Sequence, residues 1–378
     1  MPRSRRFIVI LMSFTRREFA ALGALGLAAR FAPPLLAQPA GRQTGYAIIG
    51  LGRIADIFMA GVRNSTNSKV TALVSGHRDK ALRIAADYGV PESSIYTYDN
   101  FDSIISNKDV DAVYVALPNS MHADFTIRAA KAGKHVLCEK PMAINVAECE
   151  RMIAACKSAN VKLMIAYRCH YEPTNLKAVD LIRTGAIGQV QAIETAFGFS
   201  ERLGEWRLDK KLSGGGPLMD VGIYSLNATR YLTGEEPANF AAFSSVIDQD
   251  GRFTSVEENL SWTMKFPSGI VASCATTYGG QMGGFFKVHG AKGWIGADPA
   301  FNYDGLHLHA EYFNGPRVPP TVLDEANPQK NPYQFTAQAD HFSNCVQNNL
   351  EPKTPGEEGL RDIRYITEIY RTAGISML

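Results

Sequence analysis

Three side chains have the residue types and the spacing needed to move a proton beside a fixed charge: Lys140, Asp220 and Tyr224. Lys140 follows an apolar stretch directly, in the segment Glu139-Lys140-Pro141, and Asp220 and Tyr224 are four residues apart, so on a helix they would share one face. A hydroxyl that loses a hydride must also lose a proton, and a tyrosine whose pKa is lowered by a lysine can accept it. We predict that Tyr224 is the acid/base, that Lys140 activates it, and that Asp220 orients the substrate or balances the lysine charge. Taken singly, Asp220 also fits a helix N-cap and Tyr224 a core aromatic residue.

A glycine turn marks a nucleotide site. The segment Gly50-Leu51-Gly52-Arg53-Ile54-Ala55 fits the G-x-G-x-x-G/A fingerprint, and it lies between a short apolar strand and a helical stretch. In this motif the first glycine permits a tight turn, the second lets the backbone approach a pyrophosphate, and the helix N-terminus faces the phosphates. We predict a dinucleotide site, against the alternative of a simple strand-to-helix turn.

The end of the second expected strand indicates which dinucleotide binds. NAD sites usually carry an acidic residue there, on the ribose hydroxyl. Here the chain reads Ser75-Gly76-His77-Arg78-Asp79-Lys80. A hydroxyl and the two cations Arg78 and Lys80 suit the additional phosphate of NADP. We therefore predict NADP, with solvated helix residues as the alternative for Arg78 and Lys80.

Two different patterns divide the chain into domains. Up to residue 166, short apolar strands alternate with helices, which predicts a parallel Rossmann sheet in an NADP-binding domain over residues 45–166. Residues 167–378 are expected to form an α+β domain for substrate binding and oligomerisation. In this domain, longer strand-like runs without regular helices between them indicate a large open, mostly antiparallel sheet, and a final helix is expected; the runs cover residues 190–199, 239–247, 257–266, 270–277 and 285–289, and the helix about 359–372.

The first 37 residues have the order of a signal peptide. Thr15-Arg16-Arg17-Glu18-Phe19 is a twin-arginine pattern, and an apolar run too short to span a bilayer follows it. We predict a twin-arginine signal over residues 1–37, a linker over 38–44, and a periplasmic protein with no integral membrane segment after signal removal; an amphipathic helix is the alternative. The twin-arginine route carries folded proteins, which suits a protein that must bind its cofactor before export.

The charge and cysteine composition bears on whether nucleic acid or a metal is a partner. Without the six arginines and the single acid of residues 1–37, 33 basic and 36 acidic residues remain, which gives no electrostatic reason to expect nucleic acid as a partner. The spacing of the six cysteines matches neither a metal site nor a CxxC motif, so we read them as small buried hydrophobic residues and assign no metal.

The glycine fingerprint, Glu139-Lys140-Pro141 and the Asp220–Tyr224 pair together resemble the Gfo/Idh/MocA oxidoreductases, from about Tyr46 to Arg371. Within that family the resemblance is greatest to the glucose–fructose oxidoreductase type. The resemblance implies a further set of residues around the cofactor, with Trp206 and Arg207 closing over its nicotinamide end; the set is Tyr98, Leu117, Pro118, Asn119, His122, Glu139, Lys140, Arg168, Trp206 and Arg207.

The residue at position 224 carries a further implication of the resemblance. Most members of the family have histidine there, and tyrosine is typical of the glucose–fructose type. The resemblance implies that an aldose is oxidised to its lactone and that the hydride passes through bound NADP(H) to a second sugar, which becomes an alditol. It also implies a homo-oligomer, either a dimer or a tetramer.

The segment between the expected signal and the Rossmann domain departs from the family pattern. The glucose–fructose type has a long proline-rich arm there, whereas about seven residues separate Ala37 from Gly45. This short segment favours one alternative, an NADP-dependent aldose dehydrogenase with an exchangeable cofactor. A non-catalytic sugar-binding protein is a further alternative, and the intact Lys140, Asp220 and Tyr224 argue against it. The second sugar, fructose or another aldose, also stays open.

Overall fold

The computed structural model describes residues 42–377. The predicted signal peptide and most of the predicted linker lie outside these described residues. Within them, no helix has both the length and the apolar character needed to cross a bilayer.

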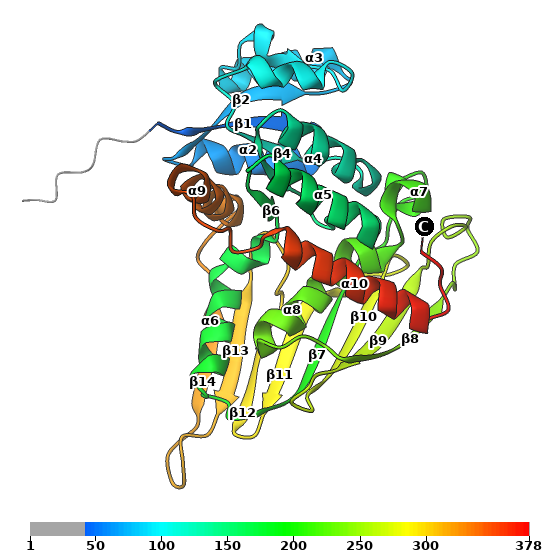
Figure 1. Cartoon of the computed structure of the whole chain (residues 1–378). Coiled ribbons are helices and arrows are strands. Elements are labelled where there is room, and N and C mark those ends of the chain that lie inside the picture. Colours follow the sequence, from blue (N-terminus) through cyan, green and yellow to red (C-terminus); the bar gives the residue numbers. More distant parts are fainter. Residues whose placement is uncertain (1–41, 378) are drawn as a thin grey trace, which may run out of the picture. The chain divides into compact units, whose positions relative to one another are not determined.

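The first sheet has six parallel strands in the order β3-β2-β1-β4-β5-β6 (Figure 1). Its strands are β1 (Thr44–Ile49), β2 (Ser68–Val74), β3 (Ile95–Tyr96), β4 (Ala112–Val115), β5 (His135–Cys138) and β6 (Leu163–Ile165). All residues of β1 and β4 are buried, as expected of central strands that helices cover on both faces. The order reverses between β1 and β4, and open sheets of this kind bind ligands at the carboxyl ends of the strands beside such a reversal.

Helices connect these strands. They are α2 (Arg53–Arg63), α3 (Arg78–Tyr88), α4 (His122–Lys131) and α5 (Val146–Ser158), with short helical turns η1 (Glu92–Ser94), η2 (Phe101–Ser106) and η3 (Asn119–Met121). The predicted alternation of strand and helix is confirmed.

The second sheet has eight strands in the order β14-β13-β12-β11-β7-β10-β9-β8. Every neighbouring pair is antiparallel except β7 and β10, so the predicted open, mostly antiparallel sheet is confirmed. Its strands are β7 (Val190–Gly198), β8 (Asn239–Ser245), β9 (Asn259–Lys265), β10 (Val271–Thr277), β11 (Gly283–Gly290), β12 (Gly293–Ala297), β13 (His307–Tyr312) and β14 (Thr321–Ala326).

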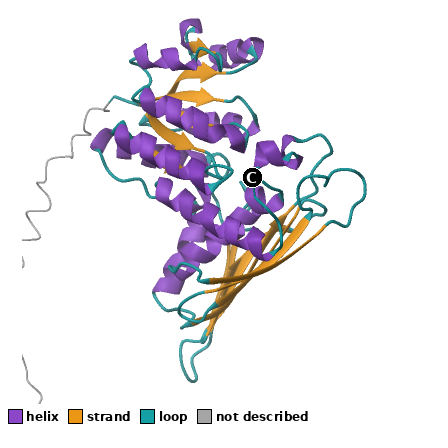
Figure 2. Cartoon of the chain, turned by 45° about the vertical axis from the view of Figure 1, so that its right-hand side comes forward, coloured by secondary structure: helices purple, strands orange, loops and turns teal. Residues whose placement is uncertain are grey.

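Helices cover one face of this sheet (Figure 2). Buried and exposed residues alternate along β9, as they do in a strand with one covered and one open face. The helical elements after β6 are η4 (Arg168–Tyr171), α6 (Pro173–Arg183), η5 (Trp206–Leu208), α7 (Lys210–Ser213), η6 (Leu218–Gly222), α8 (Ile223–Thr233), α9 (Tyr333–Asn348) and α10 (Gly356–Thr372). The expectation that no regular helices separate the late strands was wrong, because α8 lies between β7 and β8. Helices α6 and α9, which flank the eight strands, were not predicted.

Helix α9 packs against the Rossmann sheet although the sequence boundary at residue 167 assigned it to the second domain. Phe335, Ala339 and Phe342 belong to the same buried cluster as residues of β1 and α2. The Tyr46 hydroxyl on β1 lies 3.0 Å from the Ser343 hydroxyl on α9. The late helix therefore completes the core of the nucleotide-binding half.

Candidate functional site

A cavity of about 540 Å³ lies beside the carboxyl ends of β4 and β5. The sequence prediction placed twelve of its lining residues in the site: Arg53, Ile54, Leu117, Asn119, His122, Glu139, Lys140, Arg168, Trp206, Arg207, Asp220 and Tyr224. It missed the others, most of them aromatic or polar: Ala116, Phe197, Phe199, Val221, Phe301, Asn302, Tyr303 and Asp304. The three predicted catalytic residues, which lie up to 84 positions apart in the chain, do meet in one place.

Asp220 accepts hydrogen bonds from two cationic side chains of this cavity. Lys140 Nζ donates to its Oδ1 at 3.0 Å and to its backbone carbonyl at 2.7 Å. Arg207 Nε and the Tyr278 hydroxyl donate to Oδ2 at 3.0 and 2.8 Å. The sequence offered Asp220 two roles, and this geometry supports charge balance. Tyr278 was missed because a single tyrosine beyond β10 carries no motif.

These contacts shift the pKa values of both partners away from neutrality. Burial alone would raise the pKa of Asp220, but the Lys140 and Arg207 cations lower it well below its usual range. Burial opposes the charge on Lys140, and the carboxylate of Asp220 nevertheless raises the pKa of Lys140 above its ordinary value. The pair is therefore ionised throughout the physiological range.

Tyr224 lies between two cations. Lys140 Nζ is 4.8 Å from its ring centroid, and the guanidinium carbon of Arg168 is 4.9 Å from the same centroid. Burial raises the pKa of Tyr224, and Arg168 and Lys140 offset that rise only in part. The expected activation by Lys140 is thus present but outweighed, and Arg168 contributes more than Lys140 does. Tyr224 keeps its proton at rest.

Arg168 also fixes a loop that closes the cavity. Its guanidinium donates to the Phe301 and Asn302 carbonyls, and to the Gln334 side chain on α9 at 2.7 Å. It also stacks 4.5 Å from the centroid of Tyr303. The resemblance assigned Arg168 to the cofactor; the structure adds that it holds the aromatic loop after β12 against the site.

The backbone that carries Asp220 and Tyr224 is not one regular α-helix. Residues 218–222 form a π-helical turn, η6, and α8 begins only at Ile223. The spacing of four still brings both side chains to the same cavity, but from a π-helical turn that runs into α8 and not from one regular α-helix. The extra residue in the turn aims Asp220 at Lys140 while the Tyr224 ring remains in the cavity.

The glycine turn has room for a pyrophosphate. Gly50 has φ +86°, and a Cβ there would lie 2.5 Å from the Ala116 carbonyl oxygen, so only glycine fits. A Cβ on Gly52 would meet nothing within 4 Å, and no side chain caps the start of α2. The first amide groups of α2 are therefore available to an anion. The residues present fit a dinucleotide.

The residues predicted to select NADP differ in how close they lie to this glycine turn. The Lys80 ammonium donates to the Leu51 carbonyl, which brings a cation to the glycine turn. Ser75 is buried and accepts a hydrogen bond from the His77 amide at 3.0 Å, while Tyr98 packs on Gly76. Arg78 is exposed and lies 3.4 Å from Glu92, so its predicted role in the site is the least supported by the geometry.

Several residues assigned by resemblance also hold the wall of the cavity together through their hydrogen bonds. The buried His122 ring lies 2.9 Å from both the Pro141 and the Leu117 carbonyl oxygens, so it joins the two turns that follow β4 and β5. Asn119 donates to the Ser213 carbonyl at 2.8 Å. Glu139 accepts the Tyr114 hydroxyl at 2.5 Å, and burial raises the pKa of this carboxyl group. Pro118 precedes the turn η3.

Trp206 lies in η5 at the cavity rim, and its ring stacks under the Arg207 guanidinium at 4.8 Å. All six cysteines are free and buried, so their reading as small buried hydrophobic residues is confirmed.

Two family models match the chain. The model described as an oxidoreductase family with an NAD-binding Rossmann fold matches residues 44–167, and that of the GFO/IDH/MocA C-terminal domain matches residues 175–296. The chain therefore belongs to the Gfo/Idh/MocA oxidoreductase family, as its sequence predicted. The expected nicotinamide-dependent enzyme class is confirmed.

Several individual proteins are similar to this chain over most of its length. The solved aldose-aldose oxidoreductase of Caulobacter crescentus, complexed with glycerol, is 48% identical, with a TM-score of 0.83, and the match covers 88% of this chain and 98% of that one. A D-xylose 1-dehydrogenase of Haloarcula marismortui, named as an NADP(+) enzyme, is 32% identical over 336 residues, 87% of this chain and 90% of its own. A levoglucosan dehydrogenase bound to NADH and levoglucosan is 21% identical, with a TM-score of 0.77, and supports the fold alone.

Proposed function

We propose that this protein is an NADP-dependent sugar oxidoreductase that oxidises an aldose to its lactone and reduces a second sugar to an alditol. The observation that carries the proposal is the Tyr224 ring held between Lys140 and Arg168 in the cavity. The 48% identity with a protein named aldose-aldose oxidoreductase, over nearly its whole chain, supports it. The twin-arginine pattern supports a periplasmic location, which we propose with it.

The proton and hydride balance without any other reactant. In the first half the aldose loses a hydride from C1 and a proton from its C1 hydroxyl; in the second half an open-chain sugar takes a hydride at its carbonyl carbon and a proton at its oxygen. The nicotinamide, when bound, carries the hydride between the halves. Tyr224 accepts the first proton as a phenolate, the form that the Arg168 and Lys140 cations favour, and returns it to the second sugar as a phenol. Because burial favours the neutral phenol, Tyr224 must lose its resting proton before the aldose is oxidised.

NADP is the form of cofactor that we propose. The Lys80 ammonium at the glycine turn and the absence of an acid at Ser75 support it. Two relatives are named as NADP(+) enzymes, both of them D-xylose 1-dehydrogenases. We also propose that the chain forms a homo-oligomer, because the open face of the second sheet exposes apolar side chains such as Phe243, Val271 and Val322.

The decisive test uses protein purified without added cofactor. The nucleotide released on denaturation is identified by mass, and the protein is then supplied with glucose alone or with glucose and a second sugar. We expect bound NADP(H), a single burst of lactone with glucose alone, and continuous lactone and alditol when the acceptor is present. Lactone formation that always depends on added NADP would contradict transfer through a retained cofactor.

A simple aldose dehydrogenase is the second candidate. The match to a protein named D-xylose 1-dehydrogenase and the short segment before the Rossmann strand favour it. In that case the purified protein would release no nucleotide, and it would reduce added NADP in step with the aldose consumed. The same experiment therefore separates the two candidates, and no turnover under either condition would favour a sugar-binding protein.

A further inference from the structure

The hairpin at one edge of the second sheet carries three metal-binding side chains on one face. His307 and His309 are two residues apart on β13, so both project to the same side, opposite to the buried Leu308 and Ala310. Asp324 on β14 is paired directly with His309 in the antiparallel register. The backbone ladder of the hairpin thus fixes the relative positions of the three side chains.

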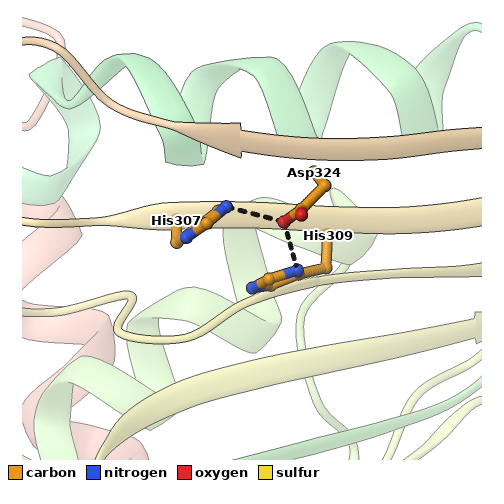
Figure 3. Close-up of side chains that lie close together, drawn as sticks. All are labelled: His307, His309 and Asp324. Carbon is orange, nitrogen blue, oxygen red and sulfur yellow. Dashed lines mark ion pairs between the residues drawn. The ribbon is translucent and has the colours of Figure 1, made fainter.

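The side chains converge on one oxygen atom (Figure 3). His307 Nε2 lies 2.7 Å and His309 Nδ1 lies 3.1 Å from Asp324 Oδ1. The two imidazole rings are stacked, with centroids 4.3 Å apart and planes 21° from parallel. All three potential ligand atoms lie within 4.8 Å of one another.

A hydrogen-bond network accounts for this arrangement only in part. His307 Nε2 is shielded from solvent and, despite its short distance to Asp324 Oδ1, makes no correctly directed hydrogen bond. A buried polar atom in this condition normally has a partner that satisfies it. His307 Nε2 therefore lies next to Asp324 Oδ1 but forms no hydrogen bond with it.

We propose that His307, His309 and Asp324 bind a divalent transition-metal ion of the zinc and copper class. Two imidazole nitrogens and one carboxylate oxygen are ligands that Zn²⁺ accepts at about 2.0–2.2 Å, with water in the fourth position. Tetrahedral ligands at that radius are about 3.3 Å from one another, so the contacts of 2.7 and 3.1 Å need to open only slightly. In the single chain Asp324 is 70% exposed, so a water molecule can reach the fourth position of the ion.

The neighbouring positions leave space for the ion. Gly296 is the partner of His309 on β12, and Ala326 is the partner of His307 on β14, so neither brings a long side chain onto this face. His289 and Glu194 also meet in this sheet, at 3.6 Å, but they supply only two ligands. That pair is a natural control for adventitious binding.

The site would act on the loop that closes the cavity. The His307 amide donates to the Pro299 carbonyl, and the His307 carbonyl accepts from the Asp298 amide. These two hydrogen bonds hold together the ends of the loop that carries Phe301 and Tyr303. An ion that joins β13 to β14 would fix the end of this loop. The ion is therefore structural, and it lies on the sheet face opposite to the covered core.

The test titrates Zn²⁺ into the untagged, cofactor-loaded chain after chelator treatment, by calorimetry, with Co²⁺ absorption as a second reading. We expect one saturable Zn²⁺ per chain. His309→Ala and Asp324→Asn should each weaken binding by tenfold or more, whereas His289→Ala should leave it unchanged. Zn²⁺ should also raise the Tm of the wild type and of His289→Ala, but not of Asp324→Asn.

Two results would overturn the proposal. One is a titration without saturable binding; the other is equal Zn²⁺ binding by the wild type, His309→Ala and Asp324→Asn. The circular-dichroism spectrum of Asp324→Asn without metal shows whether that variant is folded. Because Asp324 is exposed, we expect it to be, and His309→Ala provides an independent second variant.

Discussion

Asp220 uses three of its acceptor positions on Lys140, Arg207 and Tyr278. A carboxylate that is already bound by two cations and a phenol has little capacity left for a sugar hydroxyl. Its main effect is to fix Lys140 in place, so that the ammonium lies over the Tyr224 ring. Removing only one member of such a buried ion pair leaves an uncompensated charge, which typically costs about 3–5 kcal/mol.

At the residue scale, Tyr224→Phe is the sharpest test of the catalytic assignment. The change removes the hydroxyl group to which the proton transfer is assigned and leaves the ring near its two cations. We expect kcat to fall by about 10²–10⁴-fold. Sugar binding, measured by the quenching of tryptophan fluorescence, should change little.

Tyr231→Phe is the matched control. Tyr231 lies on the same helix, α8, and its hydroxyl is buried without a hydrogen-bond partner among the described residues. The control should therefore turn over normally. Normal turnover by Tyr224→Phe itself would show that another group moves the proton.

At the scale of elements, α9 acts as part of the Rossmann half. Gly61 on α2 lies so close to α9 that a Cβ there would be 2.8 Å from the Phe335 Cβ and 2.9 Å from the Thr336 amide nitrogen. Both helices are regular at this crossing, so neither backbone can move away without a cost in free energy. The contact holds a helix whose N-terminus faces the glycine turn.

We therefore expect Gly61→Ala to destabilise the protein. The steric cost of about 1–3 kcal/mol exceeds the gain of up to about 1 kcal/mol from replacing glycine within a helix. Thermal unfolding should show a lower Tm. Gly280→Ala is the control, since a Cβ there meets nothing within 4 Å, and a Tm loss equal in both variants would contradict the packing argument.

The helices and loops of this region show what could be predicted from the sequence. The parallel strands were recognisable because central strands are continuously apolar, and a glycine turn follows β1 at Gly50. The spacing of Phe335, Ala339 and Phe342 was also a helical signal, and it went unused. Which sheet α9 covers is not a local property, because an amphipathic face fits any apolar surface. The same holds for Phe301 to Asp304, which line the cavity without a motif.

At the scale of the whole described body, a buried polar network joins the end of the first sheet to α8 and α10. His170 Nε2 lies 2.7 Å from the Asn227 side-chain oxygen, and Asn227 donates to Asp362 at 3.0 Å. Arg230 pairs with Asp362 at 2.6 Å. This network lies beneath α8, the helix that carries Tyr224, so it supports the site without touching it.

The network makes a prediction about stability and pH. Burial lowers the pKa of His170 to about 4, whereas the unfolded chain takes up this proton near pH 6.5. The stability that His170 contributes is therefore complete above pH 6.5 and is lost as the pH falls toward 4. Burial raises the pKa of Asp362 to about 6, so the contribution of Asp362 to stability changes with pH in the opposite direction. Asp362 is present both in the wild type and in a His170 variant, so a comparison of the two isolates His170.

We expect His170→Gln to lose less stability on acidification than the wild type does. Urea unfolding at pH 6.5 and pH 4.5 should show a difference of roughly 2 kcal/mol between the two losses. His77→Gln, at an exposed position, should behave like the wild type. Parallel losses in all three proteins would show that His170 does not titrate as its burial implies.

The contact of Arg168 with the Phe301–Asn302 loop and with Gln334 on α9 has a consequence for biosynthesis. The glycine turn at Gly50 is made early, but the loop at Phe301 that encloses its ligand is translated about 250 residues later. A nascent chain on the ribosome can therefore form the Rossmann strands long before it can enclose a dinucleotide. Whatever the protein's final compartment, the cofactor can be enclosed only after the Phe301–Asn302 loop and α9 have been translated.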